Sequence, residues 1–179
     1  HIQVLQKEEG EKGELQSKLK HLADLASGTL TGLEETINNL HPPMLVRHGL
    51  AGSLQRLITR INDLGKTKFG LKTENMTDRL DQGTELLLFR ICSELINNTL
   101  KHSGAKRAVL QLSALRKSLR LKYMDDGCGF EYDLEKIEER KSGINNIMQR
   151  VESMNGQFKI STAPGEGIEL MITLPLVKV

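Results

Sequence analysis

Four short segments in the second half of the chain alternate apolar and polar residues, and no other feature restricts the fold as strongly. The segments are AVLQLS and SLRLKYM, separated by ALRK, and QFKISTA and IELMITLPL, which flank PGEG. Strict alternation predicts strands with one buried face, and two such strands joined by a short turn predict a β-hairpin. With a further short strand at KFGLKTEN, the chain is expected to contain a largely antiparallel sheet.

Helical patterns surround these strands and should cover one face of the sheet. The helices are expected over about 50–64, from Asp81 or Gly83 to His102, and at GINNIMQRVESMNG, which Gly156 should close. An Asp or Gly favours the start of a helix, and a Gly favours its end. Strands with helices on one face predict an α+β two-layer sandwich.

The first 40 residues have a different pattern. From Leu15 to Leu40, apolar residues recur at close to heptad spacing, as in a helix that packs along a partner helix. The HPP sequence at 41–43 should end that helix. We therefore expect a partial helical hairpin over residues 1–41, with its second helix at about 15–40, and the sandwich over residues 42–179.

Composition argues against several classes of protein. The 25 basic and 23 acidic residues give a net charge of +2, which disfavours a protein built to bind nucleic acid or acidic membranes. The two cysteines form no CxxC pair and the histidines show no metal-ligand spacing, so a reducing compartment without a structural metal is expected. Without an apolar run of about 18 residues or a signal-like start, this sequence should neither span a membrane nor carry a secretory signal.

Polar residues interrupt the predicted long helix at ELINNTLKHSG. At about 100° per residue, four of them share one arc of the helix. They are Glu94, Asn97, Asn98 and Lys101, whereas Ile91, Cys92, Leu95, Ile96, Thr99 and Leu100 fill most of the remainder. Such an arc can simply be a solvated helix face.

A second polar group, MDDGCGF, directly follows one of the predicted strands. By itself a D-x-G-x-G sequence indicates only a tight turn. Together the two groups could hold a nucleotide, because Mg²⁺ can take a single side-chain carbonyl such as that of Asn98 when phosphate and water supply the other oxygens. Lys101 could place a cation against phosphate, and Asp125 could accept a hydrogen bond from an exocyclic base amine. Gly127 and Gly129 would let the backbone approach the base closely.

These motifs resemble those of a known family. ELINNTLKHS resembles the N box and DDGCGF the G1 box of the ATP-binding domain of sensor histidine kinases, while SGINNIMQRVESMNG and STAPGEGIELMITLPL are similar to their G2 region and C-terminal hairpin. The combination most resembles the subfamily that pairs with NarL-type response regulators. The resemblance implies a Bergerat-type ATP-binding fold, a mixed, largely antiparallel sheet with helices on one face.

The resemblance also implies a role for each site residue. Asn98 would coordinate Mg²⁺, Lys101 would meet phosphate, and Asp125 would accept a hydrogen bond from the adenine amine. Glu94 would lie near the γ-phosphate as a base or a water-orienting group. His102 occupies a position that faces the nucleotide in relatives, although on sequence alone it could equally pack or cap. The glycines that would shape the pocket are Gly127, Gly129 and Gly143.

Two residues depart from the family pattern. Lys141-Ser142-Gly143 keeps only the second glycine of the usual G-x-G in the G2 box, which weakens the expected phosphate grip of the lid at about 131–142. The N-terminus of the following helix could still offer backbone N–H groups to an anion. Thr99 replaces the alanine that is common after the magnesium asparagine.

A paired-helix dimerisation domain with the phosphorylated histidine precedes the ATP-binding domain in this family. NNLHPPMLVRHGL resembles the end of its second helix and the junction. His1 is followed by Ile2 rather than by an acidic residue. A first-helix stub of about six residues would extend only about 9 Å along a second helix of about 38 Å. We therefore expect the chain to start inside the first helix, to lack the phosphoacceptor histidine and not to autophosphorylate.

For the intact protein, the resemblance implies transfer of the γ-phosphoryl group of ATP to a histidine and then to an aspartate of a NarL-type regulator, within a homodimer. The chain alone is expected to be a monomer or a weak dimer, and cytoplasmic, either freely or as part of a membrane-anchored sensor. Two alternatives stay open. One is another ATPase of the superfamily, such as an anti-sigma-factor kinase, gyrase or MutL, and the other is a non-catalytic ATP-sensing or dimerisation module.

Overall fold

The structure is a computed structural model that describes residues 43–64, 67–76, 79–132 and 143–176. The described residues belong to one compact unit. Its strands are β1 (Lys68–Glu74), β2 (Arg107–Ala114), β3 (Ser118–Asp125), β4 (Gln157–Thr162) and β5 (Ile168–Pro175). Its helices are α2 (Pro43–Leu64), α3 (Gln82–Asn98), the π-helical turn η1 (Thr99–Ser103) and α5 (Gly143–Ser153). The predicted heptad helix and the division after residue 41 lie outside the described residues.

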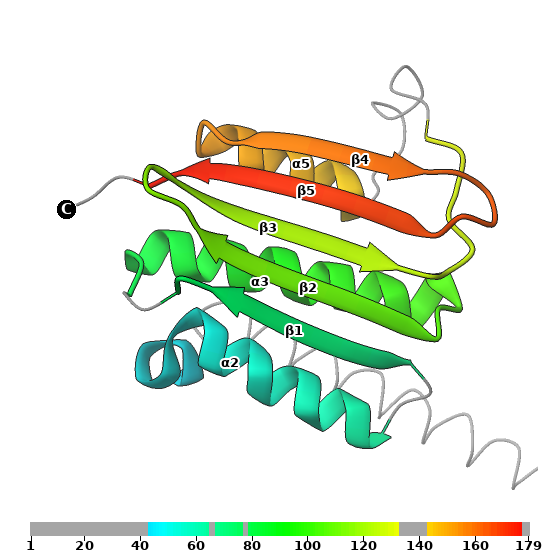
Figure 1. The fold of residues 1–179 in the computed structure, drawn as a ribbon, viewed down its shortest axis with the longest axis horizontal. Coiled ribbons are helices and arrows are strands. Elements are labelled where there is room, and N and C mark those ends of the chain that lie inside the picture. Colours follow the sequence, from blue (N-terminus) through cyan, green and yellow to red (C-terminus); the bar gives the residue numbers. More distant parts are fainter. Residues whose placement is uncertain (1–42, 65–66, 77–78, 133–142, 177–179) are drawn as a thin grey trace, which may run out of the picture. The chain divides into compact units, whose positions relative to one another are not determined.

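The strands form one sheet in the order β1-β2-β3-β5-β4 (Figure 1). Both predicted hairpins are present, since β2 pairs with β3 and β4 with β5 in antiparallel register. An antiparallel β3–β5 pair joins the hairpins. The edge strand β1 runs parallel to β2, with α3 as the connection between them. The predicted mixed, largely antiparallel sheet is therefore confirmed.

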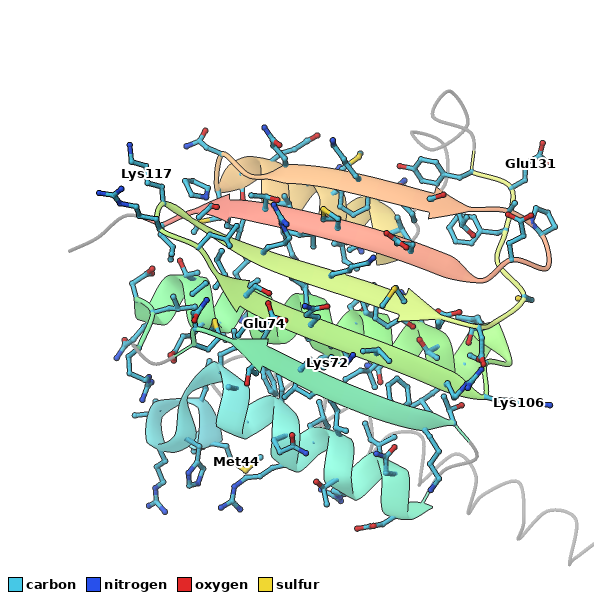
Figure 2. All side chains as sticks on the ribbon, in the orientation of Figure 1. Met44, Lys72, Glu74, Lys106, Lys117 and Glu131 are labelled. Carbon is cyan, nitrogen blue, oxygen red and sulfur yellow. The ribbon has the colours of Figure 1, made fainter. Side chains whose placement is uncertain are left out.

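Helices α2, α3 and α5 cover one face of the sheet, as predicted (Figure 1). Alternate residues of β3 enter the core against them, and Leu119, Leu121 and Tyr123 are all at most 1% exposed. The opposite face is polar, with Lys72 and Glu74 on β1 (Figure 2) and an ion pair of 2.9 Å between Lys122 Nζ and Glu169 Oε1. One buried face of alternating side chains is the pattern that the sequence predicted.

Helix α2 begins at Pro43 and not at about Leu50 as expected. Gly49 interrupts it with a φ of 65° and a ψ of −178°, so two helical segments meet at a kink. The positive φ is accessible to glycine at little cost, whereas it strains other residues. The apolar spacing after Gly49 predicted the second segment. The first segment was not predicted, because the kink separates it from that regular spacing.

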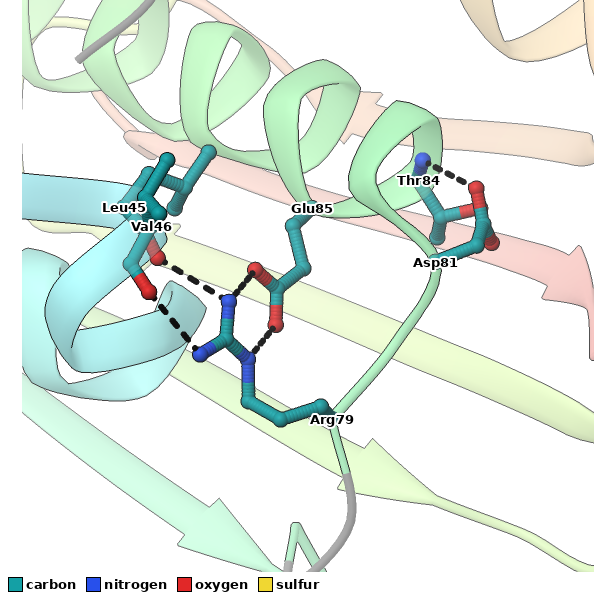
Figure 3. Close-up of polar contacts among 6 residues, drawn as sticks. All are labelled: Leu45, Val46, Arg79, Asp81, Thr84 and Glu85. Atoms are coloured by element: carbon teal, nitrogen blue, oxygen red, sulfur yellow. Dashed lines mark hydrogen bonds and ion pairs between the residues drawn. The ribbon is translucent and has the colours of Figure 1, made fainter. Parts of the chain in front are cut away.

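Arg79 joins the first turns of α2 and α3 (Figure 3). Its Nη1 and Nη2 donate to the backbone oxygens of Val46 and Leu45, at 3.2 and 3.1 Å. Its Nε and Nη2 also donate to the two carboxylate oxygens of Glu85, each at 2.8 Å. The Glu85 side chain is only 2% exposed, so the buried charge is compensated by a bidentate partner. We call this set of contacts the Arg79 clamp.

Helix α3 begins where the sequence predicted. The Asp81 carboxylate accepts a hydrogen bond of 2.9 Å from the backbone N–H of Thr84, as an N-cap does. The helix continues as the π-helical turn η1 and ends before Gly104, whose φ is 61°. Leu100, expected to lie away from the polar arc, is 44% exposed. The wider π-helical turn departs from the regular 100° step between residues, so the arc projected for an α-helix does not continue unchanged through η1.

The end of α5 also differs from the expectation. Asn155, with a φ of 53°, takes the left-handed position that was expected of Gly156. The N–H groups of Asn155 and Gly156 donate to the oxygens of Glu152 and Val151, each at 2.9 Å, which is the Schellman pattern. A Cβ on Gly156 would lie 2.5 Å from Cδ2 of Leu174. Glycine is needed there for close packing rather than for its backbone angle.

Candidate nucleotide site

Glu94 and Asn98 lie one turn apart on α3 and face the start of α5. Both side chains are half-buried, and neither forms a hydrogen bond with another described residue. A Cβ added to Gly143 would overlap Oε1 of Glu94 and lie 2.9 Å from Nδ2 of Asn98. The absence of a side chain at Gly143 therefore lets the first turn of α5 approach both residues. Free N–H groups at a helix N-terminus can bind an anion.

Asp125 ends β3 and is buried, with 9% of its surface exposed. Its Oδ1 accepts a hydrogen bond of 2.8 Å from the backbone N–H of Gly127. Its Oδ2 accepts one of 2.7 Å from the hydroxyl of Tyr123. Both carboxylate oxygens are therefore oriented, and each keeps a lone pair with which to accept another donor.

The loop after Asp125 is fastened to η1. The backbone N–H of Cys128 donates to the oxygen of Ser103 at 2.8 Å. A Cβ added to Gly127 would lie only 2.7 Å from that same oxygen. The hydroxyl of Ser103 in turn donates to the backbone oxygen of Thr99 at 3.0 Å. The two polar groups that the sequence singled out therefore meet in space through Gly127 and Ser103.

Gly129 has a φ of 55° and packs against the β4–β5 turn. A Cβ added there would overlap the backbone oxygen of Ala163 and lie 2.8 Å from that of Gly167. A side chain at Gly129 would thus push the loop away from the turn. The glycine serves close contact between two segments of the protein itself.

The two adjacent carboxylates of the second polar group point to different partners. Asp126 is exposed, and its Oδ1 accepts hydrogen bonds of 2.8 Å from the backbone N–H groups of Lys106 and Arg107. These contacts, with that of Arg107 foremost, hold the pKa of the Asp126 carboxyl below its usual range. Asp126 therefore fixes the start of β2, whereas Asp125 points into the protein.

Lys101 and His102 lie in η1 with exposed side chains. Neither side chain forms a hydrogen bond or an ion pair within the part of the chain that the structure describes. The backbone oxygen of His102 lies 3.5 Å from Sγ of Cys128. Of the predicted site residues, the fold brings Glu94, Asn98 and Gly143 into direct proximity. Lys101 and His102 follow Asn98 closely in the sequence, and their side chains are exposed at the surface.

Three residues that sequence analysis gave no role complete the polar arrangement: Thr99, Ser103 and Tyr123. The Tyr123 hydroxyl contacts both the Asp125 carboxylate and the Thr99 hydroxyl. Strand alternation carried a signal for Tyr123, because residues two apart on a strand share a face. No comparable signal existed for Ser103, since its role depends on a turn whose π-helical geometry the sequence does not predict.

Comparisons with known proteins identify the family to which the chain belongs. Residues 83–178 match the family described as histidine kinase-, DNA gyrase B-, and HSP90-like ATPase. Sensor histidine kinase ComP of Bacillus subtilis is 29% identical over 91% of this chain, and sensor histidine kinase LiaS of the same organism is 25% identical over 88%. The aligned chain spans 21% of the length of ComP and 42% of that of LiaS.

A solved structure supports the same assignment. The histidine kinase domain of the blue-light activated histidine kinase EL346 from Erythrobacter litoralis superposes with a TM-score of 0.56 and 25% identity. The superposition covers 71% of this chain and 65% of that domain. The chain therefore belongs to the family of histidine kinase-, DNA gyrase B- and HSP90-like ATPases, and it carries an ATP-binding domain of the sensor histidine kinase type.

Proposed function

We propose that the chain holds Mg-ATP between α3, the start of α5 and the loop after β3, and that the intact protein passes the γ-phosphoryl group to a histidine. One observation carries this proposal: Gly143 brings the first turn of α5 directly against Glu94 and Asn98. The first turn of a helix, a carboxylate and an amide lie together there, and a helix N-terminus with oxygen ligands nearby suits a bound triphosphate and its cation.

Asn98 is the proposed protein ligand of Mg²⁺. Its half-buried amide has no hydrogen-bond partner among the described residues, so the carbonyl oxygen is available to a cation. The described residues contain no cluster of three or more His, Cys, Asp or Glu that could hold a metal by themselves. That composition suits a magnesium ion that takes most of its oxygens from phosphate and water. The ion would neutralise charge on the phosphates.

The base is proposed to lie against Asp125, with the exocyclic amine of adenine donating to the oriented carboxylate. Gly127 and Gly129 keep the loop after β3 close to η1 and to the β4–β5 turn, and this packing would hold the loop in place beside the base. Lys101 would reach phosphate as a point charge, and His102 would face the nucleotide from the same turn.

Glu94 is proposed to act at the γ-phosphate as a base or as the group that orients the attacking atom. The phosphoryl group would then move from the histidine to an aspartate of a response regulator of the NarL type, in a homodimer. Such a kinase would work in the cytoplasm. None of the helices that the structure describes is long and apolar enough to cross a membrane.

Calorimetry of ATP binding with and without Mg²⁺ tests the site. We expect magnesium-dependent binding that Asn98→Ala and Asp125→Ala each weaken at least about tenfold, because each removes one polar contact. Circular dichroism of both variants must match that of the parent chain. A folded parent chain that binds no ATP would refute the proposal.

Radiolabelled ATP tests the chemistry. None of the five histidines in the chain is followed by an acidic residue, so we expect no base-stable, acid-labile label on this chain alone. The full-length protein should label itself and pass the label to its regulator. If the full-length protein binds ATP but transfers nothing, a non-catalytic ATP-sensing module replaces the kinase as the interpretation.

A further inference from the structure

A chain of buried hydroxyl groups ends on the carboxylate that is proposed to read the base. Tyr123 is 1% exposed, and its hydroxyl lies between Oδ2 of Asp125, at 2.7 Å, and the hydroxyl of Thr99. Thr99 is 2% exposed, and its Oγ1 lies 2.8 Å from the backbone oxygen of Leu95. The series therefore runs from α3 through β3 to the site.

The direction of the hydrogen bonds follows from the number of protons. An ionised Asp125 can only accept, so the Tyr123 proton must point toward it. The Tyr123 oxygen can then accept from Thr99, whose single proton serves either Tyr123 or Leu95. Burial of the ring is the main cause that raises the pKa of the Tyr123 hydroxyl, and the hydrogen bond to Asp125 raises it further. The hydroxyl therefore stays protonated in neutral solution and remains a donor.

These contacts restrict how the Asp125 carboxylate can turn. The last torsion of an aspartate is broad and roughly two-fold, so an unsupported carboxylate samples many orientations. Here Gly127 holds one oxygen and Tyr123 holds the other. A base amine that binds between them meets an acceptor already in place, which lowers the cost of ordering on binding.

Thr99 also ties this carboxylate to the helix that carries the proposed magnesium ligand. It directly follows Asn98 at the point where α3 becomes η1. An alanine at this position would have no hydroxyl to give, and a phenylalanine at 123 would leave Oδ2 of Asp125 without its donor. Both hydroxyls are therefore needed for the full series.

We propose that Tyr123 and Thr99 are positioning residues that hold Asp125 ready for the exocyclic amine and thereby set the preference for adenine. This inference rests on the proposed nucleotide site. Neither residue is proposed to touch the nucleotide. Their effect should fall on the part of the affinity that depends on the amine, and on no other part.

The test compares ATP with purine riboside triphosphate, which lacks the exocyclic amine. We expect Tyr123→Phe to weaken ATP binding about tenfold and to leave the affinity for purine riboside triphosphate unchanged, because one hydrogen bond to a charged group is lost. Thr99→Ala should reduce the same preference about threefold, and Thr99→Ser should restore it because the hydroxyl returns.

A matched control tests whether losing any such threonine bond has the same effect. Thr59→Ala removes an equivalent hydrogen bond, which the exposed Thr59 Oγ1 on α2 donates to the backbone oxygen of Gln55, four residues earlier, at 2.9 Å. This control should not alter the ratio of the two affinities.

Each other outcome is decisive. Equal weakening of both nucleotides by Tyr123→Phe would mean that Tyr123 only packs, and no weakening would mean that Asp125 needs no support; either overturns the inference. If Tyr123→Phe does not fold, the Thr99→Ala and Thr99→Ser pair decides. Failure of the proposed base contact itself would look different, because Asp125→Ala would then leave the preference for ATP over purine riboside triphosphate unchanged.

Discussion

Helix α3 carries a glutamate near each end, and the two side chains have opposite surroundings. Glu85 is 2% exposed and accepts two hydrogen bonds from Arg79, which also holds the first turn of α2. Glu94 is half-buried and accepts none from the described residues. The same residue type on the same helix thus has hydrogen-bond partners within the protein at one end, whereas at the other end it has none among the residues that the structure describes. Satisfied polar groups stabilise the fold, and unsatisfied ones are available to a ligand.

Replacement of Glu94 should give the largest effect, and it should fall on chemistry alone. In the proposed full-length kinase we expect Glu94→Gln to lower the rate of autophosphorylation about a thousandfold, the loss typical of a removed proton-transfer group. The free energy of unfolding should stay within about 0.5 kcal/mol, because no partner is lost. Rapid-quench assays with labelled ATP and urea denaturation measure the two quantities. A variant that is as fast as the parent would remove Glu94 from the proposed mechanism.

Replacement of Glu85 should do the reverse. We expect Glu85→Ala to lower the free energy of unfolding by about 3 kcal/mol, because a buried, doubly hydrogen-bonded carboxylate is removed and a cavity remains. ATP affinity should be unchanged at a temperature where the variant is folded. Glu94→Ala is the matched control in the same urea titration. If both variants were equally stable, the Arg79 clamp would contribute nothing to the fold.

A methyl group at Gly143 should disturb the open end of α3 while leaving the fold in place. We expect Gly143→Ala to weaken ATP binding about tenfold, since the added Cβ meets Glu94 and Asn98 where the phosphates would lie. The flexible end of Glu94 can move aside, so stability should change little. Gly70→Ala is the control, because a Cβ there would lie 3.8 Å from Val109. Unchanged calorimetric affinity in Gly143→Ala would place the phosphates elsewhere.

The smallest expected effect concerns the N-cap of α3. Hydrogen bonds with Thr84 hold the pKa of Asp81 below its usual 3.8. The folded pKa lies below the unfolded one, so the stabilisation is fully present above about pH 4 and is lost as the pH falls through the folded value. Asp81→Ser should keep the cap but remove this pH dependence. In urea titrations at pH 6 and in steps below pH 4, the parent should lose at most about 1 kcal/mol more stability than the variant, because the other carboxylates titrate in both.

The elements with regular periodicity could be predicted from the sequence. Alternation located both hairpins, and Asp81 marked the start of α3 within a residue. The parts that escaped prediction are places where a single backbone angle or helix type changes the geometry. The kink at Gly49 meant that the first segment of α2 was not predicted. The end of the long helix is π-helical, which its pattern did not indicate, and Asn155 takes the left-handed position ahead of Gly156.

The candidate site was predictable residue by residue, but not as an arrangement. Motif resemblance singled out Glu94, Asn98, Asp125 and Gly143, and the fold places Gly143 against Glu94 and Asn98. Thr99 looked like a mere departure from a family pattern until the structure showed its hydroxyl beside that of Tyr123. Contacts between segments far apart in sequence depend on register, and one sequence does not supply it.

Helix α3 lies in the connection between the parallel strands β1 and β2, and this place in the chain affects when the site can form during folding. The β2–β3 and β4–β5 hairpins connect neighbouring segments, and hairpins form in about microseconds. Pairing of Lys68 with Arg107 in the β1–β2 ladder must first close a long loop, which makes it a slow step. Glu94 and Asn98 lie within that loop. A nucleotide bound against them would therefore stabilise the completed fold relative to any state in which the β1–β2 ladder is unpaired.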